Sequence, residues 1–113
     1  MNLSLEGKNA VVCGSTQGIG LAIAEELALL GANCTLIARN EEALKAAVHT
    51  LDIALRQQHG YLVADFSKPD DVRDVIMTHV TKTPVHILIN NSGGPAAGPV
   101  IEATEEAFLN TFN

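Results

Sequence analysis

The sequence is poor in cysteine, in aromatic residues and in positive charge. Its 113 residues include two cysteines, four histidines and no tryptophan, and aromatic residues make up 4% of the chain. Cys13 and Cys34 do not form a Cys-x-x-Cys pair, so we expect two reduced, buried thiols rather than a disulfide framework. The histidines lack the spacing of metal ligands, and the sequence therefore indicates no metal site.

Acidic residues outnumber basic residues in this chain. Seven Lys and Arg against thirteen Asp and Glu give a formal net charge of −6, which argues against nucleic acid or an anionic membrane as partner. The apolar runs end well before the roughly 18 residues of a membrane span. Asn2, Ser4 and Glu6 interrupt any signal-peptide core. We expect a cytoplasmic chain, and its 47% hydrophobic residues predict one compact domain over residues 1–113.

Short β-branched runs alternate with longer segments of helical period, a pattern typical of βαβ units on a parallel sheet. Strands are expected at residues 8–13, 33–38, 61–64 and 85–89. The first helix should follow the glycine-rich residues 14–20 and end at Gly31. Its predicted sheet-facing positions are Ile19, Ala22, Ile23, Leu27 and Leu30.

Two further helices follow from the same periodicity. One begins at Glu41, with Asn40 as its N-cap, and its inner face is expected to hold Leu44, Val48, Leu51 and Leu55. The next begins at Pro69, ends before Pro84 and should bury Val72, Val75, Ile76 and Val80. A last, short helix is expected after Thr104.

Right-handed crossovers place the expected strands in the order 3-2-1-4, which is the first half of a doubly wound α/β sheet. The fourth strand then becomes an edge. This edge is apolar and uncharged, with Val85, Ile87, Leu88 and Ile89. Because such an edge invites pairing, we expect more protein to belong beside it.

The turn after the first strand has the sequence Gly-Ser-Thr-Gln-Gly-Ile-Gly. Gly14 allows a tight turn, Gly18 lets the backbone approach a diphosphate, and Gly20 permits close packing of the helix on the strand. The free N–H groups and positive dipole end of the following helix attract phosphate. The plain alternative is a cluster of turn glycines without a ligand.

The glycine spacing, together with two later motifs, resembles the short-chain dehydrogenase/reductase family. The motifs are the three glycines after a Val-Val strand, Asp65 after the third strand, and the segment 90–93 (Asn-Asn-Ser-Gly) after the fourth. The resemblance extends over essentially the whole chain. It implies a Rossmann-like, three-layer αβα fold and a nicotinamide coenzyme.

The resemblance also implies roles for single residues. Near the coenzyme diphosphate and adenosine ribose it places Ser15, Gln17, Gly18 and Ile19. Asp65 would accept a hydrogen bond from the adenine amino group, with the backbone of Phe66 beside it. The alternative for Asp65 is a helix cap, a role that Ser67 could also fill.

Further roles concern the end of the fourth strand. There Asn91, Ser92 and Gly93 would pass along the ribose near the nicotinamide, although Asn and Gly are also ordinary turn residues. Two positions depart from the family pattern. Cys13 stands where Thr is usual, which removes a hydroxyl link between the first and fourth strands, and Ser92 replaces the usual Ala. Neither change breaks the coenzyme interpretation.

The end of the second strand favours NADP(H) over NAD(H). An acidic residue there would bind the 2′-hydroxyl, whereas a cation accepts the 2′-phosphate. This chain has Ala38 followed by Arg39 and Asn40, and the guanidinium offers a rigid fork of donors to a phosphate. The alternative is a solvated Arg39 that pairs with Glu41 or Glu42.

The family's catalytic Ser, Tyr and Lys cannot be placed in these residues. Tyr61 is the only tyrosine, and the residue four positions later is Asp65 rather than lysine. Asn113 falls two positions short of the family's catalytic Asn, so no catalytic residue is assigned. We therefore expect this chain to be the coenzyme-binding half, ending within the fourth helix.

Two functions remain open. The first is an oxidoreductase that interconverts a carbonyl and an alcohol with NADP(H), for which a 3-oxoacyl thioester, a sugar, a steroid and a small ketone are all possible substrates. The second is a noncatalytic module that binds NADP(H) for regulation. In the complete protein the family resemblance implies a homo-dimer or homo-tetramer.

Overall fold

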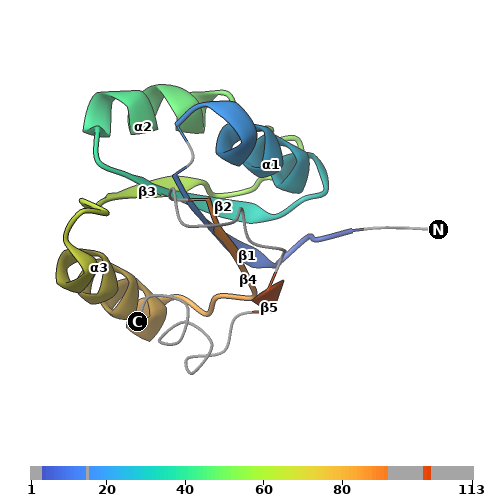
Figure 1. Cartoon of the computed structure of the whole chain (residues 1–113). Helices are drawn as coiled ribbons and strands as arrows, with labels where there is room; N and C mark the ends of the chain where they lie inside the picture. The colour runs from blue at the N-terminus through green and yellow to red at the C-terminus, as the bar shows by residue number, and fades with distance from the viewer. Residues whose placement is uncertain (1–3, 15, 92–100, 103–113) are drawn as a thin grey trace.

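The computed structural model describes residues 4–14, 16–91 and 101–102 (Figure 1). Strands and helices alternate along the chain in the order β1 (Asn9–Cys13), α1 (Gly18–Leu29), β2 (Asn33–Ala38), α2 (Glu41–His49), β3 (Gly60–Val63), α3 (Pro69–Lys82), β4 (Ile87–Asn90) and β5 (Ile101–Glu102). The sheet order is β3-β2-β1-β4-β5. Strands β1 to β4 are parallel, which confirms the predicted order 3-2-1-4.

Helices cover both faces of the sheet. Figure 1 shows α1 and α2 on one face and α3 on the other, so the described residues form three αβα layers. Neighbouring residues of β1 point to opposite layers: Val12 packs with the α1–α2 side and Val11 with the α3 side. A strand buried on both faces must be apolar throughout, which explains the Ala-Val-Val-Cys run of β1.

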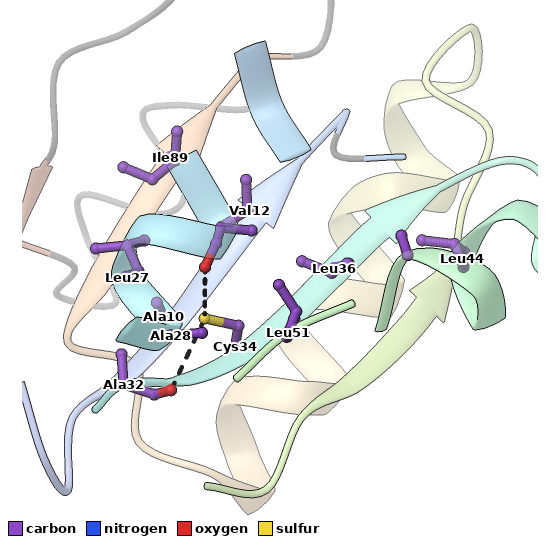
Figure 2. Close-up of a cluster of buried hydrophobic side chains, with 12 residues drawn as sticks. Ala10, Val12, Leu27, Ala28, Ala32, Cys34, Leu36, Leu44, Leu51 and Ile89 are labelled. Atoms are coloured by element: carbon purple, nitrogen blue, oxygen red, sulfur yellow. Dashed lines mark hydrogen bonds between the residues drawn. The ribbon is translucent and has the colours of Figure 1, made fainter. Parts of the chain in front are cut away.

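The larger core cluster lies between the sheet and α1 and α2. Figure 2 shows Val12, Leu36 and Leu44 converging there, and each is fully buried. Cys34 belongs to this cluster, while Cys13 lies on the opposite face of the sheet. Both thiols are free, as predicted, and burial raises the pKa of each to about 12. They therefore act as small apolar groups rather than nucleophiles.

Helix α1 buries the predicted face only in part, because Leu27 is buried and Ile23 packs against the larger core cluster, but Ala22 is exposed. Its buried residues are Gly20, Ala24, Leu27 and Ala28, whereas Ile19 is 64% exposed. Three of the four buried residues are small and recur every fourth position, which lets the helix approach the sheet closely. The helix is apolar on nearly all sides, so periodicity alone could not identify this face. Gly31 ends the helix as predicted, with φ +102° and its N–H bonded to the Ala28 carbonyl at 2.9 Å.

Several predicted boundaries were wrong by one or more residues. Helix α2 ends at His49, so Leu51 and Leu55 lie beyond it; Leu51 is buried and Leu55 is 48% exposed. The Thr50 hydroxyl donates to the Ala47 carbonyl at 2.7 Å, a local bond that accompanies the end of the helix. Strand β4 begins two residues later than predicted, at Ile87, and β3 begins one residue earlier, at Gly60.

The prediction that β4 forms the edge of the sheet was also wrong. Strand β5 pairs with it antiparallel, with Ile87 opposite Glu102 and Leu88 opposite Ile101. A sequence stretch of two residues carries no strand signal, and this pairing was therefore missed. The helix predicted after Thr104 lies outside the described residues.

Histidines hold the amino ends of the central strands. His59 Nδ1 accepts a hydrogen bond from the Cys34 N–H at 3.0 Å, and its Nε2 lies 2.7 Å from the Asp52 carbonyl. His86 Nδ1 accepts from the Asn9 N–H at 3.0 Å. Both rings thus serve backbone groups at strand starts. In the described part of the chain, no three His, Cys, Asp or Glu side chains gather in a metal-binding arrangement, and no helix has the length and apolarity to span a membrane.

Candidate functional site

The turn between β1 and α1 adopts a backbone that favours glycine. Gly14 has φ +71° and Gly18 has φ +64°, both in the left-handed region that side chains disfavour. The Gly14 N–H bonds to the Ile37 carbonyl at 2.8 Å, which fixes the start of the turn against β2. The backbone of Gly14 thus forms the predicted tight turn, while the approach of a diphosphate at Gly18 stays a prediction.

Gly20 lies in the first turn of α1, directly against the glycine-rich turn that precedes the helix. A Cβ atom at this position would be 2.3 Å from the Gly14 carbonyl oxygen and 3.0 Å from Asn91 Nδ2. No side chain fits there without moving the backbone. The contact also brings the end of β4 to the glycine turn, so two motifs that are far apart in the sequence lie side by side.

The amino end of α1 faces this turn without a side-chain cap. Gln17 is the N-cap residue but makes no capping hydrogen bond, and the first turn contains no acidic residue. The first N–H groups of a helix and its positive dipole end favour an anion when no side chain serves them. Gln17, Gly18 and Ile19 are exposed, so a ligand could reach them. These residues fit a diphosphate.

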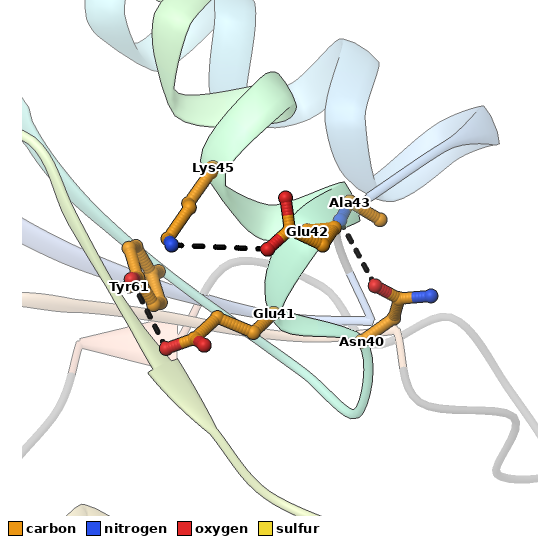
Figure 3. A network of polar contacts seen from close by, with 6 residues as sticks. All are labelled: Asn40, Glu41, Glu42, Ala43, Lys45 and Tyr61. Atoms are coloured by element: carbon orange, nitrogen blue, oxygen red, sulfur yellow. Dashed lines mark hydrogen bonds and ion pairs between the residues drawn. The ribbon is translucent and has the colours of Figure 1, made fainter.

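The end of β2 carries a cation beside a capped helix. Asn40 Oδ1 accepts from the Ala43 N–H at 3.0 Å, which confirms its predicted N-cap role. The Tyr61 hydroxyl donates to Glu41 at 3.2 Å, and Glu42 pairs with Lys45 at 3.8 Å (Figure 3). The two carboxylates that the sequence offered as alternative partners of Arg39 thus have other partners, and Arg39 is exposed.

Asp65 forms a local turn after β3 instead of capping α3. Its Oδ1 accepts from the Ser67 N–H at 2.9 Å and from the Ser67 hydroxyl at 2.7 Å. The cap position of α3 belongs to Lys68, which has no side-chain capping bond, so neither Asp65 nor Ser67 is the helix cap. The Ser67 hydrogen bonds hold the pKa of Asp65 below its usual value, and the charges of Arg39 and Lys68 lower it further. Asp65 is therefore an anion close to Arg39.

The end of β4 is tied to the end of β1 through the backbone. The Asn91 N–H donates to the Cys13 carbonyl at 3.1 Å, so these strands are linked although Cys13 has no hydroxyl. Phe66 is half-buried and packs against the core cluster on the α3 side. Ser15, Ser92 and Gly93, which were also predicted to contact the coenzyme, lie outside the described residues.

Parallel strands bring their carboxyl ends to one edge of a sheet. Here that edge gathers the described residues of the predicted site, which are Gly14, Gln17, Gly18, Ile19, Gly20, Arg39, Asn40, Asp65, Phe66 and Asn91. The edge includes the junction of β1 and β4, where the strand order reverses and α/β proteins bind ligands. The fold is thus of the Rossmann type.

Comparison with known proteins identifies the family. Residues 8–113 match the family described as short chain dehydrogenase, and the chain belongs to it. An inactive hydroxysteroid dehydrogenase-like protein 1 from Homo sapiens is 41% identical over 87 residues, which are 77% of this chain and 26% of that protein.

Two solved structures place the match in three dimensions. The L-sorbose reductase of Gluconobacter frateurii in complex with NADPH and L-sorbose is 33% identical, with a TM-score of 0.73 over 95% of this chain and 41% of that one. A 3-oxoacyl (acyl-carrier-protein) reductase of Agrobacterium tumefaciens with NADP bound is 34% identical, with a TM-score of 0.71 over 94% of this chain and 39% of that one. The chain therefore spans between a quarter and two-fifths of the length of these relatives.

Sequence reasoning missed one contact in this region. Tyr61 was considered as a proton donor and rejected, but its hydroxyl anchors the start of α2 through Glu41. Partial desolvation raises the pKa of Tyr61, and the hydrogen bond and charge of Glu41, with the charge of Glu42, raise it further. Tyr61 stays a hydrogen-bond donor at neutral pH. The two residues are 20 positions apart, and no local motif connects them.

Proposed function

We propose that the complete protein is an NADP(H)-dependent oxidoreductase that interconverts a carbonyl and an alcohol, and that this chain supplies its coenzyme-binding half. The observation that carries the proposal is the approach of Gly20 to the Gly14 carbonyl beside the uncapped amino end of α1. A turn closed this tightly leaves room only for backbone, which suits the close approach of a diphosphate.

The proposed contacts lie along the carboxyl ends of the parallel strands. The diphosphate would lie on residues 14–20, including Ser15, with Gln17, Gly18 and Ile19 near the adenosine ribose. Asp65 would accept from the adenine amino group, beside the Phe66 backbone. Asn91, with Ser92 and Gly93, would line the ribose near the nicotinamide. When bound, the coenzyme supplies or accepts a hydride; the residues of this chain bind and orient it.

The preference for NADP(H) rests on Arg39 and Asn40. Glu41 and Glu42 are engaged by Tyr61 and Lys45, and the nearby Asp65 carboxylate is held by Ser67, which leaves the Arg39 guanidinium for a 2′-phosphate. A charge-assisted hydrogen bond contributes about 1.5–3 kcal/mol. We therefore expect Arg39→Ala to weaken NADPH binding by about ten-fold or more, and NADH binding much less.

Isothermal titration of both coenzymes into the wild-type chain and the Arg39→Ala variant tests this preference. Arg73→Ala is the matched control, because Arg73 pairs with Asp70 on α3 and lies outside the predicted contacts. Equal discrimination before and after Arg39→Ala would remove Arg39 from the proposal.

A noncatalytic NADP(H)-binding module is the second candidate. The observation that favours it is that the human relative is named inactive. Turnover separates the candidates. NADPH oxidation by the complete protein with a 3-oxoacyl thioester or a sugar ketone supports the enzyme, whereas binding without turnover across ketone substrates supports the module.

We also propose that the complete protein is cytoplasmic and forms a homo-dimer or homo-tetramer. The charge balance and the absence of a spanning helix in the described residues are consistent with the first point. Family membership supports the second. Light scattering coupled to size-exclusion chromatography of the complete protein measures the oligomeric state.

A further inference from the structure

The start of α2 is anchored to the neighbouring strand β3 by one side-chain hydrogen bond. Tyr61 lies opposite Leu36 in the register of β3 and β2, and its ring packs against the larger core cluster. This packing presents the hydroxyl to the first residue of α2, and the Tyr61 hydroxyl donates to Glu41 Oε2 at 3.2 Å (Figure 3).

Two side chains could bind the Glu41 carboxylate, namely the Tyr61 hydroxyl and the Arg39 guanidinium. Glu41 follows Arg39 by two residues, and both of these side chains are exposed. A carboxylate that paired with Arg39 would neutralise the charge that a 2′-phosphate requires. In the structure the carboxylate lies with Tyr61 instead, while Glu42 pairs with Lys45.

We infer that Tyr61 is a positioning residue for coenzyme specificity: it holds Glu41 against β3 and so keeps Arg39 available to a 2′-phosphate. This inference rests on the proposed role of Arg39. It adds a residue that touches neither the coenzyme nor the reacting atoms. Its effect should appear in the ratio of the NADH to the NADPH dissociation constant, because affinity for the shared parts of the two coenzymes does not depend on Glu41.

Tyr61→Phe removes the hydroxyl and keeps the ring in the core. The released Glu41 then competes for Arg39, and the ratio should fall by about two- to five-fold, the range that exposed charge pairs give. The fall should shrink in 1 M salt, where charges are screened within about 3 Å. Thr35→Val, which removes a hydroxyl from the adjacent strand away from this edge, should leave the ratio unchanged.

Glu41→Gln completes the test. A neutral side chain cannot neutralise Arg39, so the Tyr61→Phe/Glu41→Gln double variant should have the same ratio as Glu41→Gln alone. A ratio that stays at the wild-type value in Tyr61→Phe, or a fall that persists in the double variant, would overturn the inference. Thermal melts show whether each variant retains its fold, and only folded variants are compared.

Arg39→Ala separates this inference from the proposed function. If Arg39→Ala leaves the ratio unchanged, Arg39 does not bind the 2′-phosphate and this inference fails with it, whereas a wild-type ratio at or below one shows that the NADP(H) preference itself is wrong. If Arg39→Ala lowers the ratio but Tyr61→Phe does not, Arg39 keeps its role and only the positioning role of Tyr61 fails.

Discussion

Single hydrogen bonds decide what the charged residues at the site can do. Asp65 is held as an anion by the hydroxyl and N–H of Ser67, and its own N–H donates to Asp71 Oδ2 at 3.1 Å. Asp65 is thereby held through both its side chain and its backbone N–H. A carboxylate fixed in this way at the end of β3 is an acceptor that does not need to reorganise when a donor arrives.

Ser67→Ala should raise the pKa of Asp65 toward its usual value, because the Ser67 hydroxyl is the largest cause of its lowered pKa. The remaining bond from the Ser67 N–H keeps it somewhat low. Since the folded pKa lies below the unfolded value of about 3.9, Asp65 stabilises the fold above that value, and the contribution is lost as the pH falls through the folded pKa. A carboxyl ¹³C NMR titration measures the shift.

The control for this titration is Thr81→Ala, which removes a hydroxyl that bonds within α3, to the Thr78 carbonyl. It should leave the Asp65 titration where it is in the wild type. An Asp65 midpoint that does not move in Ser67→Ala would contradict the assignment of the Ser67 hydroxyl as the main cause.

Local residue roles could be predicted from sequence where a local rule applies. Asn40 before two glutamates is a cap pattern, and the structure contains that cap. The Asp65 alternative failed because an Asx-type turn and a helix cap use the same residue types, and only the backbone decides between them. The Tyr61–Glu41 bond depends on the register of β3 beside β2, which sequence spacing does not encode.

The β1–turn–α1 unit is the element on which the proposed function depends. The positive φ angles of Gly14 and Gly18 and the space-limited position of Gly20 all arise from one requirement, which is that the helix begins directly against the end of β1. The glycine spacing predicted this turn. The buried face of α1 was predicted only in part, because Gly20, Ala24 and Ala28 pack closely through their small size rather than their hydrophobicity.

Gly20→Ala should disrupt this unit. The added methyl would lie 2.3 Å from the Gly14 carbonyl oxygen, so the turn must move. We expect a loss of about 1–3 kcal/mol in the free energy of unfolding, as for other overpacking substitutions. We also expect coenzyme affinity to fall by at least about ten-fold, which corresponds to about 1.4 kcal/mol. Urea denaturation and titration with NADPH measure the two effects.

Gly60→Ala is the matched control, because a methyl at Gly60 meets no atom within 4 Å and its φ is not in the left-handed region. It should change the free energy of unfolding by no more than about 0.5 kcal/mol. Wild-type coenzyme affinity in a folded Gly20→Ala variant would show that the diphosphate does not bind at this turn.

Across the whole molecule, the order of the strands brings distant segments to one place. The parallel order 3-2-1-4 was predictable because right-handed crossovers leave few alternatives. The antiparallel pairing of β5 was not, because two residues carry no periodicity. The predicted apolar edge of β4 is thus covered over Ile87 and Leu88.

A coenzyme that touches the ends of four strands should stabilise the molecule as a unit. By mass action, NADPH at one hundred times its dissociation constant should raise the free energy of unfolding by about 2.7 kcal/mol. For a domain of about 100 residues this corresponds to a rise in Tm of about 10–20 °C, measurable by differential scanning fluorimetry. NADH at the same concentration should raise Tm less, because it lacks the 2′-phosphate proposed to bind Arg39. A rise in Tm of equal size in Gly20→Ala would show that the stabilising contacts lie elsewhere, since that variant alters the glycine turn and leaves the ends of the other strands unchanged.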